Sequence, residues 1–243
     1  MQKIISYPIS ILFAACLLII LIFFHGLQWL AFNLFGYQAH KKVVDWLVWW
    51  LMAGTGILGT TYKFEQEEKL PTDRPIIFVS NHQSMFDIPM MIWFFRNNHP
   101  KFVSKKELGK GFPSVSYNLK HGGSVLIDRK DAKQALGAIK SLGQYITKYN
   151  RSAVIFPEGT RSRDGQLKRF SENGVKMLCK FAPNALVVPL TINNSWKLFR
   201  YGKFPYGLGA RIKLYAHKPL NIGDYDFPTL MQVIEEKIKT KLE

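Results

Sequence analysis

The feature that most constrains this chain is the absence of charge from its N-terminal region. Between Ile4 and Ala39 there is no lysine, arginine, aspartate or glutamate, and residues 11–24 read ILFAACLLIILIFF. An apolar segment of this density predicts a helix in a membrane. A cleaved signal peptide is the competing interpretation, but the apolar region is too long for one and no A-x-A cleavage site follows it.

A second uncharged run, residues 46–62, follows Lys41 and Lys42 and contains three tryptophans, which suit the interface between lipid and water. Two topologies are open. In a hairpin of two full spans, the two lysines would lie across the membrane from the basic remainder of the chain, against the positive-inside bias. In a monotopic arrangement both segments enter one leaflet and all basic groups stay cytoplasmic, so we favour this second topology.

The rest of the chain is strongly basic. Lysine and arginine number 33 against 17 acidic residues, a formal net charge of +16. Residues 1–62 carry three lysines and one aspartate, a net of 3 − 1 = +2, so +14 lies on residues 63–243. A basic domain attracts nucleic acid, an anionic membrane or acidic substrates, and charge alone does not choose among them.

Several chemistries lack their key residues. The two cysteines, Cys16 and Cys179, form neither a disulfide framework nor a zinc-ligand spacing, so we expect a reducing, cytoplasmic setting and no metal site. No Walker A, H-E-x-x-H or G-x-S-x-G motif occurs either.

Beyond residue 62 the pattern alternates between short apolar runs and amphipathic helices. Strands are predicted at 75–80, 124–127, 152–156, 185–192 and 211–217, and helices at 88–95, 131–149, 171–182 and 228–242. This alternation predicts an α/β fold with a mostly parallel central sheet flanked by helices. We therefore divide the chain into a membrane-anchoring helical segment, 1–62, and an α/β domain, 63–243, whose ligands belong at the carboxyl ends of the strands.

One candidate site follows the first predicted strand, where residues 81–87 read N-H-Q-S-M-F-D. The ordinary pKa of histidine, about 6.5, leaves it mostly neutral at pH 7, so His82 can act as a general base. A turn between strand and helix could bring the Asp87 carboxylate back to the imidazole, to fix its tautomer. The alternative is that Ser84 or Asp87 caps the next helix and His82 is a loop residue.

A second candidate follows the strand at 152–156, where residues 156–163 read F-P-E-G-T-R-S-R. Gly159 permits close approach of a ligand to the backbone, and Arg161 offers a bidentate guanidinium for phosphate. Glu158 could hold an arginine or accept from a ligand hydroxyl. The alternative is an ordinary solvated basic loop.

A third candidate begins at Lys105 and ends with the strand that leads into Asp128 and Arg129. The same rule on strand ends places Arg129 at the ligand edge. The alternative is a surface ion pair between Arg129 and Asp128 or Asp131.

Together these segments resemble the glycerolipid acyltransferase family, specifically the 1-acylglycerol-3-phosphate acyltransferases, over residues 70–220. Four family blocks occur in the family's order. They are N-H-Q-S-x-x-D at 81–87, K-x-x-L…P…G-x-x-x-I-D-R at 105–129, F-P-E-G-T-R-S-R at 156–163 and V-V-P-L at 187–190.

The resemblance implies transfer of a fatty acyl group from acyl-CoA or acyl carrier protein to the sn-2 hydroxyl of 1-acylglycerol-3-phosphate, giving phosphatidic acid. It implies that His82 is the base and Asp87 its partner. It also implies a set of acceptor-binding residues: Lys105, Arg129, Glu158, Gly159, Thr160 and Arg161. Residues 63–243 would then be the catalytic domain. No cofactor, metal or nucleic acid is expected, and the enzyme is expected at the cytoplasmic face of a membrane, as in the bacterial inner membrane.

Two positions depart from the family pattern beside the acceptor site. Ser116 stands where glycine is common, and residues 170–174 read F-S-E-N-G in place of F-K-x-G. These departures leave open another lysolipid as acceptor. A thioesterase that uses the same base on water also remains open, as does a non-catalytic basic module for membranes or nucleic acid.

Overall fold

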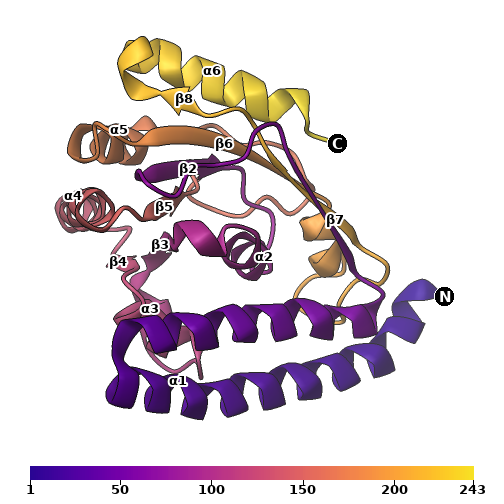
Figure 1. Ribbon diagram of the computed structural model, residues 1–243. Coiled ribbons are helices and arrows are strands. Elements are labelled where there is room, and N and C mark those ends of the chain that lie inside the picture. The colour runs from indigo at the N-terminus through magenta and orange to yellow at the C-terminus, as the bar shows by residue number, and fades with distance from the viewer.

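The central element is an eight-stranded sheet, which the computed structural model of residues 1–243 places between layers of helices (Figure 1). The strands are β1 Thr61–Gln66, β2 Ile76–Ser80, β3 Pro100–Lys105, β4 Val125–Ile127, β5 Ser152–Ile155, β6 Leu186–Asn193, β7 Arg211–Ala216 and β8 Leu220–Asn221. The helices are α1 Gln2–Gly54, α2 Asp87–Phe94, α3 Val115–His121, α4 Ala132–Tyr149, α5 Glu172–Phe181 and α6 Phe227–Thr240.

The strand order is β1-β7-β6-β2-β5-β3-β4, with β8 paired to β6. Strands β6, β2, β5, β3 and β4 run parallel to one another, whereas β7 and β8 are antiparallel to β6. This confirms the predicted mostly parallel sheet. The carboxyl ends of β2, β3, β4 and β5 consequently share one edge, where all three candidate segments begin.

Four elements were not predicted from the sequence: β1, β3, β8 and α3. Strand β3 begins with a proline and carries two lysines, so it lacks an apolar run. Strand β1 lies at the edge of the sheet with most of its side chains exposed or half-buried, and β8 and α3 are short. Tertiary pairing, rather than local pattern, makes these segments regular.

Alternate residues of β2 build two cores. Ile77 and Val79 pack in a cluster with α4, α5 and α6, whereas Ile76 and Phe78 pack with α2 on the other face. All four are fully buried. Burying such a side chain contributes about 1.5–3 kcal/mol, which explains why the first four residues of β2 are apolar and why the strand lies centrally in the sheet.

Helix α1 is a hairpin rather than one rod. Gly36 has φ 74° and ψ −163°, a conformation that is essentially restricted to glycine, and it reverses the chain so that two arms lie side by side (Figure 1). Leu47 and Leu51 of the second arm pack against Ile20 and Phe24 of the first.

The second arm belongs to the core of the α/β part. Val44, Val48 and Met52 share a cluster with residues of α2 and the sheet, and α1 also contacts α3. The predicted division at residue 62 therefore remains a prediction about function, since packing is continuous across it.

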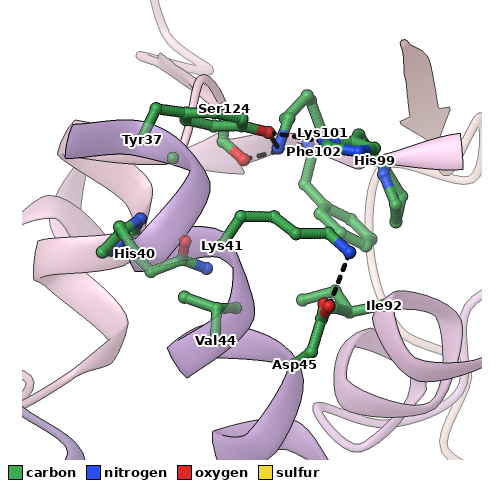
Figure 2. Close-up of a pocket in the computed structure, with 13 residues that line it drawn as sticks. Tyr37, His40, Lys41, Val44, Asp45, Ile92, His99, Lys101, Phe102 and Ser124 are labelled. Atoms are coloured by element: carbon green, nitrogen blue, oxygen red, sulfur yellow. Dashed lines mark hydrogen bonds and ion pairs between the residues drawn. The ribbon is translucent and has the colours of Figure 1, made fainter. Parts of the chain in front are cut away.

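A polar cluster also joins the second arm to the amino end of β3 (Figure 2). Lys101, which is buried, donates to the Tyr37 hydroxyl at 2.9 Å, and that hydroxyl lies 3.0 Å from His99 Nδ1. Lys41 pairs with Asp45 at 2.5 Å. Burial, aided by the charges of Arg151 and Lys41, lowers the pKa of Lys101 to about 7.

The first arm exposes large apolar side chains along its length. They include Ile11, Leu12, Leu18, Ile19, Ile22, Phe23, Leu27, Trp29, Leu30, Leu34 and Phe35. By length and composition, α1 is apolar enough to cross a membrane. An apolar face of this extent indicates that the chain associates with a membrane.

We expect Gly36→Ala to lower the free energy of unfolding by about 1–3 kcal/mol, because alanine is strained at this φ and ψ. The measurement is thermal unfolding of the full chain in detergent. The matched control is Gly26→Ala in the first arm, where an added Cβ meets nothing within 4 Å. That change should stabilise the helix by roughly 0.5–1 kcal/mol. Equal effects of the two substitutions would contradict the role of Gly36.

Candidate active site

His82 and Asp87 form a dyad at the carboxyl end of β2. His82 Nδ1 lies 2.8 Å from Asp87 Oδ2. The same oxygen accepts from the backbone N–H groups of Gln83 and Ser84, at 2.8 and 2.9 Å. The N-cap residue of α2, Phe86, has no side-chain cap bond, although the Ser84 hydroxyl accepts from Phe86 N at 2.9 Å just before the helix. The Asp87 carboxylate turns back to the imidazole instead.

This contact determines the tautomer of His82. An ionised carboxylate only accepts hydrogen bonds, so the proton lies on Nδ1 and Nε2 is left with a free lone pair. The imidazole side chain is 16% exposed, while the ring stacks on Phe156 with centroids 4.0 Å apart. A held ring with an accessible Nε2 is the geometry of a general base.

Ser195 was missed by the sequence analysis. Its hydroxyl donates to Asp87 Oδ1 at 2.5 Å, and its backbone N–H donates to Gln83 Oε1 at 3.1 Å. Ser195 is fully buried and follows the carboxyl end of β6. The rule that sites lie at strand ends could have identified it, although no motif marks it.

Asn81 fixes the loop that carries the dyad. Its side-chain amide donates to Ile192 O at 2.8 Å and its side-chain oxygen accepts from Ile192 N at 2.7 Å. This pair of bonds attaches the end of β2 to β6. Within the segment N-H-Q-S, His82 therefore supplies the reactive group and its neighbours hold it in place.

The loop after β5 forms two hydrogen bonds with the backbone of His82. Glu158 Oε1 accepts from His82 N at 3.0 Å, and Ser162 N donates to His82 O at 2.7 Å. Gly159, at φ 67°, makes the turn between them. The first and second candidate segments thus form one unit.

Glu158 is directed toward this backbone contact. Burial raises the pKa of its carboxyl to about 7, although hydrogen bonds from the backbone of His82 and Lys168 oppose the increase. Its Oε2 is buried without a partner. The acceptor-binding role of Glu158 remains a prediction, whereas its contact with His82 is a direct structural role.

Three predicted phosphate ligands lie along the same edge of the sheet. Lys105 ends β3, Arg129 follows β4 and Arg161 follows β5, and all three side chains are exposed. None forms a salt bridge. Although the Arg129 side chain is exposed, partial loss of water around its guanidinium lowers its pKa, and the nearby Arg161 cation lowers it further while Glu107 opposes both.

The proposed surface ion pair of Arg129 does not form, because both acids that could pair with it are engaged elsewhere. Asp128 lies 3.8 Å from Lys106, and Asp131 caps α4 by accepting from Gln134 N at 2.9 Å. Lys105, Arg129 and Arg161 therefore keep their positive charges free of ion pairs, which suits an anionic ligand.

Lys168 supports the exposed part of the second segment. Its ammonium donates to Arg161 O at 2.8 Å and to Thr160 Oγ1 at 3.2 Å. Thr160 and Arg161 are consequently held by a residue outside the predicted set. The cavity of Figure 2 takes no part in this site, because it lies at the amino end of β3, on the opposite edge of the sheet.

The raised pKa of Glu158 predicts a pH-dependent stability. Its pKa lies near 4.5 in the unfolded chain and near 7 in the fold, so its stabilising contribution is complete below about 4.5 and is lost as pH rises through about 7. Glu158→Gln keeps an acceptor for His82 N but cannot ionise. The melting temperature of Glu158→Gln, relative to that of the wild type, should therefore rise as the pH increases from about 4.5 to about 7. The control is Glu236→Gln, an exposed site on α6. A wild-type-to-variant difference that is constant with pH would contradict the prediction.

Comparison with known proteins gives consistent results. The Acyltransferase family profile matches residues 61–193. The chain is 31% identical to a 1-acyl-sn-glycerol-3-phosphate acyltransferase of Helicobacter pylori over 169 residues, which are 67% of this chain and 66% of that protein. It is 30% identical to a chloroplastic 1-acyl-sn-glycerol-3-phosphate acyltransferase of Arabidopsis thaliana over 163 residues, 66% of this chain. It spans 44% of the length of that plant protein.

The fold recurs in the crystal structure of the 1-acyl-sn-glycerophosphate acyltransferase of Thermotoga maritima. The TM-score is 0.82 and the sequence identity 24%, with 100% of this chain and 96% of that chain covered. This similarity supports the α/β architecture and the hairpin arrangement together, since the whole chain superposes. Because the family profile matches more than half of its residues, the chain belongs to the Acyltransferase family.

Proposed function

We propose that this protein transfers a fatty acyl group from a thioester to the sn-2 hydroxyl of 1-acylglycerol-3-phosphate, giving phosphatidic acid. The observation that carries the proposal is a His82–Asp87 dyad on the same sheet edge as three unpaired cations. A base activates a hydroxyl, and the cations bind a phosphate on the same molecule. The names of the H. pylori and Arabidopsis relatives agree with this substrate.

The reaction is direct. His82 Nε2 accepts the hydroxyl proton as the acceptor oxygen attacks the thioester carbonyl, and Asp87 stabilises the imidazolium through Nδ1. The C–S bond then breaks, and the thiolate leaves with the proton that His82 returns. One ester and one thiol replace one alcohol and one thioester, so no covalent acyl-enzyme is needed.

The acceptor phosphate is assigned to Arg161, Arg129 and Lys105. Arg161 supplies a planar guanidinium that can bind two phosphate oxygens, with Thr160 and the Gly159 backbone beside it. The donor is acyl-CoA or acyl carrier protein, both of which are anionic and suit this edge. The proposal includes no metal, no other cofactor and no nucleic acid.

The enzyme is proposed to lie on one face of the membrane, the cytoplasmic one. The second arm of α1 packs along α2 and α3, so a transmembrane hairpin would draw the α/β part into hydrocarbon. A hairpin in one leaflet keeps the basic surface in water and the first arm in lipid. Lysolipid and product then remain in the bilayer beside the site.

Replacement of the base tests the chemistry. We expect His82→Ala to lower kcat by about 10²–10⁴-fold in protein that still folds, because the positioned base is lost. The assay is transfer of labelled acyl thioester to 1-acylglycerol-3-phosphate. His121→Ala, at the end of α3, is the control. Wild-type rates in His82→Ala would refute the mechanism, and fatty acid released by the wild type without acceptor would favour a thioesterase.

Acceptor recognition is tested with Arg161→Gln. Loss of a charged hydrogen-bond donor costs about 1.5–3 kcal/mol, so kcat/KM for 1-acylglycerol-3-phosphate should fall about 10- to 150-fold. Activity on 1-acylglycerol, which lacks the phosphate, should not fall. Arg74→Gln, at the opposite edge of the sheet, is the matched control. Equal losses on both acceptors would assign Arg161 to the fold instead, and a panel of other lysolipids would locate the preferred headgroup.

A further inference from the structure

The loop between β3 and α3 exposes two large apolar side chains. Phe112 is 53% exposed and Leu108 is 37% exposed. Single exposed apolar residues are ordinary on protein surfaces. Two exposed apolar side chains from one short loop, beside an apolar helix, indicate that another surface covers them.

The loop is held in shape by Ser116, the residue that departs from the family's usual glycine. Its hydroxyl accepts from Phe112 N at 3.0 Å and donates to Leu108 O at 2.9 Å. One hydroxyl therefore bridges the backbones of both exposed residues. Gly109 packs closely against β4, because a Cβ there would lie 2.5 Å from the Leu126 side chain. These contacts fix the backbone and leave the two side chains outside.

The loop is also hydrogen-bonded to the first arm of α1. Ser114 N donates to His25 Nδ1 at 3.1 Å, and its hydroxyl donates to Leu21 O at 2.7 Å. Figure 1 shows the segment before α3 descending across the second arm to reach the first. Its exposed apolar side chains therefore belong to a segment that is hydrogen-bonded to the first arm, which itself exposes Ile22 and Phe23.

The charge of the loop suits a lipid surface. Lys106 and Lys110 are exposed beside Lys105, Lys106 also lies 3.8 Å from Asp128, and Glu107 is the only acidic residue in the loop. Apolar tips flanked by lysines match a bilayer interface, where the tips enter lipid and the ammonium groups meet lipid phosphates.

We propose that residues 106–114 form a second membrane-contact element, in which Leu108 and Phe112 enter the lipid interface beside α1. The occupant of this surface is a bilayer that contains anionic phospholipid. The proposal rests on the membrane location in the proposed function but not on its chemistry. Its consequence is that the lipid surface reaches the loop that follows β3, next to Lys105 and Arg129, so a lysolipid can present its phosphate to the site without leaving the bilayer.

Spin labels test the position of the loop directly. The full chain with Cys16→Ser and Cys179→Ala would carry a single label at Phe112→Cys, in vesicles of phosphatidylcholine and phosphatidylglycerol. Phe23→Cys on the first arm is the membrane control. Glu236→Cys on α6, which lies on the side of the molecule opposite α1 (Figure 1), is the aqueous control. The readout is accessibility to oxygen and to a water-soluble nickel complex.

We expect the label at position 112 to behave as the one at 23 does, with high oxygen and low nickel accessibility. If the label at position 112 behaves as the one at 236 does while the label at 23 is in lipid, the proposal is wrong and the membrane location stands. If the label at 23 is also in water, both the proposal and the proposed membrane location are wrong. Neither outcome depends on acyl transfer, so the chemistry is judged separately.

A kinetic measurement adds a functional readout. Phe112→Ser should raise KM several-fold for acceptor in these vesicles and leave KM unchanged for acceptor in detergent micelles, because only the membrane contact is removed. The control is Tyr149→Ser, an exposed aromatic residue at the end of α4. An equal rise in vesicles and micelles would contradict the role of the loop.

Discussion

The site depends on one buried carboxylate. Asp87 is fully buried, and its two oxygens accept from two backbone N–H groups, the Ser195 hydroxyl and the His82 imidazole. A charge removed from water is tolerated only with such a set of donors. The donors belong to the loop after β2 and to the segment after β6, so satisfying Asp87 brings two strand ends together and orients the base at once.

The loop after β5, which carries the proposed acceptor-binding residues, is part of the same assembly. His82 uses its backbone N–H and its C=O to bind the loop after β5, and its ring stacks on Phe156 of that loop. Arg161 and Thr160 extend from this loop, where Lys168 holds them. A shift of the proposed phosphate-binding residues would therefore disturb His82. This coupling suits an enzyme that must align a hydroxyl and a phosphate of one substrate.

The hairpin contributes to the fold as well as to membrane contact. Its second arm supplies core residues, and a polar cluster around Tyr37 and Lys101 joins it to the sheet. Its first arm leaves apolar residues outside, and Ser114 attaches the loop before α3 to it. The proposed orientation of the sheet edge toward lipid would thus follow from packing within the chain rather than from a flexible anchor.

The fold class, the apolar N-terminal segment and the segments that meet at the candidate site were predictable from the sequence, because period, composition and strand ends are local properties. Short apolar runs such as β2 were predicted for that reason, and the mixed strand β3 was not. Three features became visible only in the folded chain: the dyad at Asp87, the contact of Asp87 with Ser195, which lies 108 residues away along the chain, and the contact of Glu158 with the His82 backbone. These outcomes depend on which strands lie side by side, and hydrogen bonds between distant segments leave no periodic signal in the sequence.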